Sequence, residues 1–366
     1  MESTERARVA VIGLGGVSLG GHVPDYLKDE GVELVAGADP VPEARERALS
    51  LGVPRVYDDY RRMLDSERVQ FVSVLTPMWT HGDICVECAA RGLHILCEKP
   101  LATDWAMAQR IAEAVEREGV KLRVSYNYRF FVDALAARQD IVAGEIGPVY
   151  YIDFAENANF EWRSSPGRKA LNLPLVDKPF WGHPEDHPPA TRLMIIDKST
   201  HYIDMARYLT GADVESVYAQ LGYHGGHPEV GENFSSIVMV MTNGTRVHDL
   251  HNWGCHFWDR RGVVLTAATK VEGEQGTIRI ERTPDGSPGT YRLYRDNRLL
   301  KETAYRESSD KGSYGSSFLE LVRAVRQGDQ PMNNSDETLH EMRVIEACYQ
   351  SARTNQVVRI DQVELH

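Results

Sequence analysis

The sequence predicts an α/β protein that begins with a doubly wound parallel sheet and continues into a second α/β domain with a mainly antiparallel sheet. Over residues 1–125, short apolar runs alternate with helix-length stretches, which is typical of strands joined by crossover helices. Beyond residue 125 turn residues join the apolar runs, and Asn243-Gly244 is the strongest hairpin signal among them. We therefore predict two domains, 1–125 and 126–366.

Composition and charge exclude several classes of protein. A chain of 366 residues is longer than one hydrophobic core usually supports, which also favours two domains. The formal net charge of −12 would repel nucleic acid and anionic membrane surfaces. No apolar run reaches the ~18 residues that cross a bilayer, and Met1 to Arg8 lacks the apolar core of a secretory signal. Because five cysteines fit a reducing compartment, we expect a cytoplasmic protein.

A glycine-rich turn follows the first expected strand, Arg8–Ile12. Gly13 permits a tight turn, and Gly15 lets a pyrophosphate approach the backbone at the start of the next helix. Ser18 stands where the third glycine of a dinucleotide-binding turn is usual, which weakens the match. A turn with only a structural role is the alternative.

An acidic residue ends the second expected strand, Glu33–Ala38. Asp39 lies about where a dinucleotide fold places the acid that binds the adenosine ribose. A carboxylate there would repel a 2′-phosphate, so the sequence favours NAD over NADP. Arg45 and Arg47 follow closely, which leaves NADP open, and a turn aspartate before Pro40 is the alternative interpretation.

Two further strands end in polar residues. The apolar run Val69–Leu75 leads into Thr76-Pro77 and then a helix that carries His81. The run from Leu93 to Cys97 ends in Glu98-Lys99-Pro100. Pro100 restricts the backbone of Lys99, so the ammonium group can be aimed at a site at the strand's carboxyl end.

Two groups of cysteine and histidine residues could suggest metal sites. Cys85 and Cys88, with His94 and Cys97 beyond, could suggest zinc, but their spacing places them on one helix face as small core residues. His183 and His187 lie in a proline-rich stretch, 163–192, that we expect to be a long loop. Pro184 between these histidines makes a regular helix unfavourable, and we expect no metal at either place.

A second informative stretch begins a helix near Asp197. Asp197 and His201 are four residues apart and Asp204 follows three later, so all three share one side of a helix. A histidine flanked by carboxylates can accept a proton from an alcohol while a carboxylate orients it. An exposed polar helix face is the alternative.

Taken together, these motifs resemble the Gfo/Idh/MocA oxidoreductases, and the likeness runs through the carboxyl-terminal helices. The motifs are Gly13-x-Gly15 with Asp39, Thr76-Pro77 with His81, Glu98-Lys99-Pro100, and Asp197-x-x-x-His201-x-x-Asp204. The resemblance implies a Rossmann domain that binds a nicotinamide cofactor, and an α/β domain whose open sheet forms the substrate site. It also implies sugars or cyclitols as substrates and a homo-oligomer, a dimer or tetramer, formed through the carboxyl-terminal sheet.

The resemblance also implies roles for individual residues. Lys99 would hydrogen-bond the reacting oxygen, His201 would be the acid/base, and Asp197 would bind substrate or support the histidine. Weaker substrate candidates are Arg129, Trp162 and Asp204. The expected cofactor-binding set is Gly13, Gly15, Gly16, Val17, Ser18, Asp39, Thr76, Pro77, His81, Glu98 and Lys99.

Three functions are compatible with these residues. The first is a dehydrogenase or reductase that transfers a hydride between nicotinamide and a secondary hydroxyl or keto group of a sugar, sugar derivative or cyclitol. The second, also known in the family, uses tightly held NAD transiently to cleave a glycoside by elimination without net redox change. The third is a sugar- or cofactor-sensing regulator, which would need no proton relay through Lys99 and His201.

Overall fold

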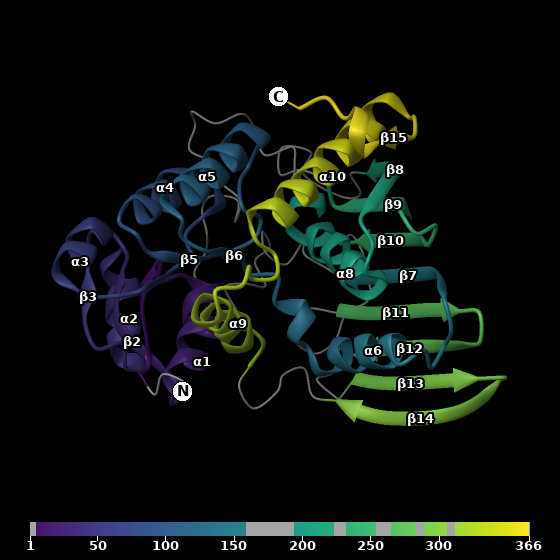
Figure 1. Cartoon of the computed structure of the whole chain (residues 1–366), viewed down its shortest axis with the longest axis horizontal. Helices are drawn as coiled ribbons and strands as arrows, with labels where there is room; N and C mark the ends of the chain where they lie inside the picture. The colour runs from purple at the N-terminus through teal and green to yellow at the C-terminus, as the bar shows by residue number, and fades with distance from the viewer. Residues whose placement is uncertain are drawn as a thin grey trace, which may run out of the picture. The chain divides into compact units, whose positions relative to one another are not determined.

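The computed structural model describes residues 5–158, 194–222, 232–253, 265–282, 289–305 and 312–365, and Figure 1 traces their elements. The chain forms two compact units. The first unit combines Met1–Phe130 with Ser308–Met342, and the second combines Phe131–Glu307 with Arg343–Leu365. The sequence analysis assigned all residues after 125 to the second domain. In the structure, Ser308–Met342 instead packs with the first unit.

The first unit contains a parallel sheet with strand order β3-β2-β1-β4-β5-β6. All of its strand pairs are parallel, as predicted. The order reverses between β1 and β4, which makes their carboxyl ends the topological switch point of a doubly wound sheet. The strands are β1 (Ala7–Ile12), β2 (Val32–Ala38), β3 (Val56–Tyr57), β4 (Phe71–Val74), β5 (His94–Cys97) and β6 (Leu122–Val124).

Helices connect these strands, and one from late in the chain completes the core. Phe318, Leu321 and Val322 of α9 (Ser313–Gln327) are buried in the same cluster as Val9 and Val11 of β1. The other helices are α1 (Val23–Lys28), α2 (Pro42–Leu51), α3 (Tyr60–Ser66), α4 (His81–Ala90) and α5 (Trp105–Glu118), with short turns η1 (Ser18–His22), η2 (Met78–Thr80) and η3 (Asn127–Phe130).

The second unit contains a nine-stranded sheet with the order β14-β13-β12-β11-β7-β10-β9-β8-β15. One pair, β10 with β7, is parallel and the other pairs are antiparallel. Asn243-Gly244 joins β9 to β10 with Gly244 at φ 87°, which confirms the predicted hairpin. The strands are β7 (Val149–Ala158), β8 (Val214–Gly222), β9 (Phe234–Met241), β10 (Arg246–Asn252), β11 (Leu265–Gly273), β12 (Gly276–Arg282), β13 (Gly289–Arg295), β14 (Arg298–Tyr305) and β15 (Val358–Arg359).

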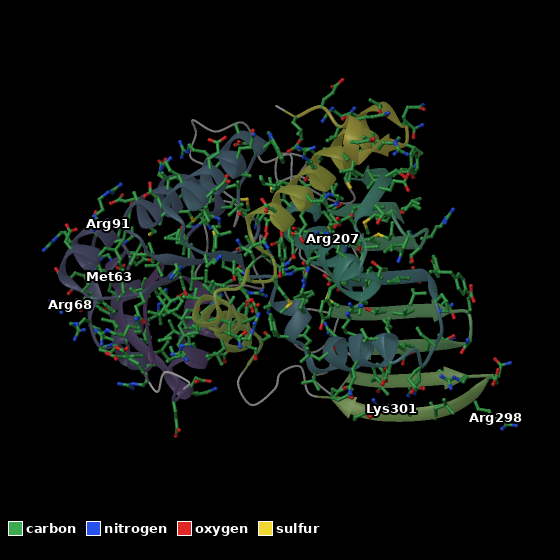
Figure 2. All side chains as sticks on the ribbon, viewed as in Figure 1. Met63, Arg68, Arg91, Arg207, Arg298 and Lys301 are labelled. Carbon is green, nitrogen blue, oxygen red and sulfur yellow. The ribbon has the colours of Figure 1, made fainter. Side chains whose placement is uncertain are left out.

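One face of this sheet is covered and the other is open. Burial alternates along β9 and β10, so alternate side chains face the core, as an antiparallel sheet with one solvated face requires. Figure 1 shows α6 and α8 laid over the sheet. Figure 2 shows Arg298 and Lys301 on the edge strand β14, where charged side chains discourage pairing with a further strand.

The helices of the second unit are α6 (Val132–Val142), α8 (Thr200–Thr210) and most of α10 (Ser335–Thr354), with a π-helical turn η5 (Ile195–Ser199) and a 3-10 turn η7 (Ile360–Gln362). In the part of the chain that the structure describes, no helix is both long and apolar enough to cross a membrane.

Candidate functional site

The ends of four strands in the first unit form one row across the sheet. Ile12 is the register partner of both Ala38 and Val74, and Val74 is the partner of Cys97. The residues that follow them therefore leave the sheet at the same edge. These residues are Gly13, Asp39, Leu75 with Thr76, and Glu98 with Lys99, so the fold brings the predicted cofactor motifs together.

The glycine turn at this edge has a closed side and an open side. Gly13 has φ +94°, and a Cβ added there would lie 2.8 Å from the carbonyl carbon and oxygen of Leu75, so the position requires glycine. Among the described residues, none lies within 4 Å of a Cβ added at Gly15 or Gly16, and the neighbouring Val17 is exposed. The exposed backbone of this turn fits the approach of a dinucleotide pyrophosphate.

Ser18 occupies a different environment from the rest of the turn. Its side chain is fully buried, and its hydroxyl has no hydrogen-bond partner among the described residues. Ser18 also begins a π-helical turn, η1, where the sequence predicted a regular helix. Any contact of Ser18 with a cofactor would therefore come from its main chain, because the side chain packs inward.

Asp39 holds the glycine turn in place. Its Oδ2 accepts a hydrogen bond from the amide of Leu14 at 2.8 Å, and its Oδ1 accepts one from the amide of Val41 at 2.9 Å. A carboxylate oxygen has two lone pairs, so each oxygen can still accept a bond from a ribose hydroxyl. Arg45 donates to the main-chain oxygen of Asp39 at 2.7 Å, which fixes a guanidinium group beside the same position.

Glu98 faces the interior beneath Lys99. Its Oε1 lies 2.8 Å from Nε2 of His22, and its Oε2 accepts a hydrogen bond from the amide of Lys99 at 3.1 Å. Burial opposes ionisation of Glu98, but the hydrogen bond to His22 and the charge of Lys99 outweigh it, so the pKa of the carboxyl group is lowered. Lys99 itself is partly exposed. The motif thus pairs a fixed buried carboxylate with an accessible lysine.

A buried chain of hydrogen bonds supports Glu98, and sequence reasoning missed it. The hydroxyl of Tyr26 lies 3.1 Å from Nδ1 of His22 and 2.8 Å from Oγ of Ser73, and His22 and Ser73 are fully buried. The ring of Tyr314 from α9 lies 4.4 Å from that of His22. His22 and Tyr26 are four residues apart, but Asp25 and Lys28 make the same segment polar, so the pair does not stand out in the sequence.

His81 joins two of the strand ends. Its Nε2 lies 2.9 Å from the carbonyl oxygen of Thr76, and its Nδ1 lies 3.1 Å from that of Pro100 and 3.2 Å from that of Leu101. Burial lowers the pKa of His81 despite these carbonyl contacts. The buried imidazole therefore lies between the loop after β4 and the loop after β5, and its two nitrogens face main-chain oxygens.

The cysteines of α4 and β5 are core residues, as predicted. Cys85, Cys88 and Cys97 are buried free thiols, and burial raises the pKa of Cys88 and Cys97 well above the ordinary value. Among the described residues, no three histidine, cysteine, aspartate or glutamate side chains are grouped so that they could hold a metal ion. His183 and His187 lie outside the described residues.

Two of the weaker substrate candidates can be assessed only in part. Arg129 is buried in η3, and its Nη2 lies 3.9 Å from Oε2 of Glu337 in the same unit. This ion pair supplies a structural role for the guanidinium group, and substrate contact by Arg129 stays a prediction. Trp162 lies outside the described residues.

The predicted acid/base residues lie on a helical segment of the second unit. Asp197 lies in η5 and His201 in α8, and both are buried, with exposures of 8% and 5%. Asp204 is fully buried. The alternative of an exposed polar helix face is therefore wrong. The segment differs from the predicted regular helix because it starts with a π-helical turn, a feature that often marks functional sites.

Comparison with known proteins identifies the class of this chain. Residues 7–126 match the model of an oxidoreductase family with an NAD-binding Rossmann fold, and residues 138–360 match the carboxyl-terminal alpha/beta domain of the same family. The chain is thus an oxidoreductase with an NAD-binding domain. It belongs to the Gfo/Idh/MocA family.

Similar proteins agree with this assignment. A D-apiose dehydrogenase of Paraburkholderia graminis is 27% identical over 99% of this chain and 92% of its own length. A myo-inositol 2-dehydrogenase of Thermotoga maritima is 24% identical over 97% of this chain and 99% of its own length. Among solved structures, an Agrobacterium radiobacter oxidoreductase in complex with NAD⁺, L-tartaric acid and magnesium has a TM-score of 0.78 at 19% identity, covering 97% of this chain and 99% of that one. At this identity the structural likeness shows the fold alone.

Proposed function

We propose that this protein is a dehydrogenase or reductase that transfers a hydride between a nicotinamide cofactor and a secondary hydroxyl or keto group of a sugar, sugar derivative or cyclitol. In this proposal the first unit binds the cofactor and the second supplies the substrate site. Relatives named as apiose and inositol dehydrogenases support the substrate class. The observation that carries the proposal is the buried carboxylate and imidazole of Asp197 and His201, because an acid/base pair shielded from water suits proton transfer.

The proposed chemistry divides the work among three side chains. When bound, the nicotinamide supplies the hydride acceptor or donor. His201 takes the hydroxyl proton at a ring nitrogen, and the ammonium group of Lys99 hydrogen-bonds the reacting oxygen. Asp197 orients the imidazole or binds a neighbouring hydroxyl. General acid–base catalysis of this kind contributes about 10²–10⁴-fold to a rate.

We propose NAD as the preferred cofactor. Both carboxylate oxygens of Asp39 already accept one backbone hydrogen bond, which holds the charge where the adenosine ribose would lie. A 2′-phosphate would meet this charge, and Arg45 beside it would offset only part of the repulsion. We further propose that Gly13, Gly15, Gly16, Val17 and Thr76-Pro77 contact the cofactor, whereas His81 and Glu98 hold the loops that do so.

The purified protein tests the proposed function directly. It would be mixed with NAD or NADP and panels of monosaccharides, glycosides and cyclitols, and the absorbance of reduced nicotinamide would be followed. Lys99→Met should remove most turnover while cofactor binding, measured by calorimetry, stays close to that of the wild type. Lys28→Met, an exposed lysine in α1, is the matched control and should stay active. If the protein neither binds a cofactor nor reduces it with any compound, the proposal is refuted.

The same panel separates the redox-neutral alternative. Release of an aglycone from a glycoside without accumulation of reduced cofactor would indicate elimination rather than net oxidation. A regulator would bind sugar or cofactor and turn over neither. The burial of Asp197 and His201 favours the dehydrogenase over the regulator, since a sensor has no need of a shielded proton acceptor.

We also propose that two copies of the chain associate through the open face of the second sheet. Val238 on this face is exposed, and Leu250 and Tyr151 on neighbouring strands are partly exposed. Light scattering after gel filtration tests this proposal: Val238→Lys should lower the measured mass to that of the monomer, and a monomeric wild type would contradict it.

A further inference from the structure

Buried charged groups lie on the core face of the nine-stranded sheet, in contact with the segment that carries Asp197 and His201. Glu156 of β7 is 1% exposed. Nζ of Lys198 lies 3.2 Å from Oε1 and 3.3 Å from Oε2 of Glu156. The hydroxyl of Tyr202 donates to Oε2 at 3.0 Å. A single carboxylate thus binds one residue of η5 and one residue of α8.

The positions of these residues relate them to the acid/base pair. Lys198 directly follows Asp197, and Tyr202 directly follows His201. Residues four apart lie on one side of a helix, and consecutive residues are turned by roughly 100° about its axis. The two pairs therefore form neighbouring stripes on the same segment. By binding Lys198 and Tyr202, Glu156 also fixes the rotation of the segment about its axis. That rotation sets the direction in which Asp197 and His201 point.

An acidic and a basic side chain on the adjacent strand lie beside Glu156. His251 of β10 is the register partner of Glu156, and its Nε2 lies 2.7 Å from Oδ1 of Asp249. Both residues of this pair are fully buried. The ring of His251 also lies 4.8 Å from that of Tyr202, so the pair packs against the same helix.

This surrounding charge keeps Glu156 ionised. Burial opposes ionisation, but Lys198 and His251 outweigh it, so the pKa of Glu156 is lowered. Burial likewise opposes protonation of His251, and Asp249 outweighs it, so the pKa of His251 is raised. Acidic and basic side chains thus alternate through Asp249, His251, Glu156 and Lys198.

Stability alone does not explain such a cluster. Replacing a buried ion pair with apolar residues of similar volume is often neutral or stabilising, because removing charges from water is unfavourable. An ion pair does, however, impose direction, since it is satisfied in only a narrow range of geometries. A sequence that keeps four ionisable groups next to the proposed acid/base segment gains orientation from them.

We propose that Glu156 is a positioning residue that sets the aim of Asp197 and His201 by holding Lys198 and Tyr202. This inference rests on the proposed dehydrogenase function for its kinetic consequence. Its structural consequence, the anchoring of the η5–α8 segment, does not depend on that function. Two kinds of measurement therefore test it.

The kinetic test uses paired substitutions. Glu156→Gln alone leaves Lys198 buried beside a neutral partner, so the double variant Glu156→Gln/Lys198→Met is used to remove both charges together. Because small misplacements of reacting groups have large effects on rate, we expect its kcat to fall about 100-fold. The KM for NAD and the melting temperature should remain close to the wild-type values.

Removal of a single hydroxyl group provides a second kinetic test, which has a matched control. Tyr202→Phe removes the bond to Glu156, and Tyr291→Phe removes an equivalent buried bond, 2.6 Å long, to Asp140 elsewhere in the same unit. We expect kcat to fall for Tyr202→Phe and to remain unchanged for Tyr291→Phe. Equal kcat values for these two variants, or a stable double variant with wild-type kcat, would overturn the proposal.

Amide hydrogen exchange tests the anchoring without any turnover. In the double variant, amides of residues 195–204 should exchange about tenfold faster than in the wild type, while those of α6 remain unchanged. If the wild type reduces no cofactor but the exchange result holds, the proposed function fails and the anchoring stands. Unchanged exchange at residues 195–204 would refute the anchoring itself.

Discussion

Nε2 of His22 lies 2.8 Å from Oε1 of Glu98, and through this contact a buried chain of hydrogen bonds reaches the backbone amide of Lys99. The chain runs from Ser73 through Tyr26 and His22 to Glu98. A lysine that must act on one oxygen atom needs a fixed backbone, because its own side chain is long and flexible. The interior of the first unit supplies this rigidity.

Replacing His22 should destabilise the protein more than removing the hydroxyl group of Tyr26, the next member of the hydrogen-bond chain. His22→Leu leaves the buried carboxylate of Glu98 without its side-chain partner, and we expect a loss of about 3 kcal/mol in the free energy of unfolding. Tyr26→Phe removes only a hydroxyl, and its loss should be about 1 kcal/mol. Urea unfolding measures both values. A larger effect of Tyr26→Phe would show that the His22–Glu98 contact is not the central one.

Acid should weaken the contribution of Glu98. Its pKa is lowered in the folded state, so in the acid range the unfolded chain binds more protons than the folded protein does. The stability gained from this group is therefore present above the ordinary glutamate pKa and is lost as the pH falls toward the lowered, folded value. The difference in unfolding free energy between wild type and Glu98→Gln, followed by urea titration, should shrink on acidification. If this difference in unfolding free energy grew on acidification, the pKa of Glu98 would be raised rather than lowered in the folded protein.

The two sides of the glycine turn should respond differently to alanine. Gly13→Ala would press a methyl group against the backbone of Leu75 at a positive φ, and we expect at least about 2 kcal/mol of destabilisation. The methyl group of Gly15→Ala meets no atom of the described residues within 4 Å, so the melting temperature should stay unchanged while NAD affinity falls about tenfold if the pyrophosphate lies there. Wild-type NAD affinity in a folded Gly15→Ala protein would move the pyrophosphate elsewhere.

Asp39 should control the choice between NAD and NADP. Asp39→Asn keeps an oxygen for the amide of Leu14 and removes the charge that would face the ribose in the proposed cofactor site. Losing one charge-assisted hydrogen bond, and the repulsion of a 2′-phosphate, should raise the NADP-to-NAD ratio of kcat/KM about tenfold. Arg45→Ala in the same background should reverse part of this gain. An unchanged ratio in Asp39→Asn would place the ribose away from this carboxylate.

Much of the fold follows from local patterns in the sequence. The strands of the first unit are buried on both faces, so they appear as continuous apolar runs such as the one that forms β1. The Asn243-Gly244 hairpin is predictable because a positive φ there favours these residues. The packing of α9 in the first unit could not be foreseen, since an apolar helix face indicates burial without indicating its partner.

The residues at the strand ends of the candidate site were predictable from the sequence, whereas the buried residues that support them were not. Gly13, Asp39 and Lys99 follow strands that periodicity locates, and their chemistry is visible in the residue types. His22 and Glu156 were missed because each is recognised only by a partner distant in sequence, at 76 residues in one case and 42 in the other. The π-helical turns at Ser18 and Ile195 also left no signal in the hydrophobic pattern.

We propose that Lys99 and His201 act on the same hydroxyl group, and a double-mutant cycle on the rate of hydride transfer tests this central proposal most directly. Single-turnover reduction of NAD would be measured for the wild type, Lys99→Met, His201→Asn and the double variant. Residues that act as a unit are strongly non-additive, so the double variant should be about as slow as the slower single variant. Losses that simply multiply would mean that the two residues act independently, and would contradict the account.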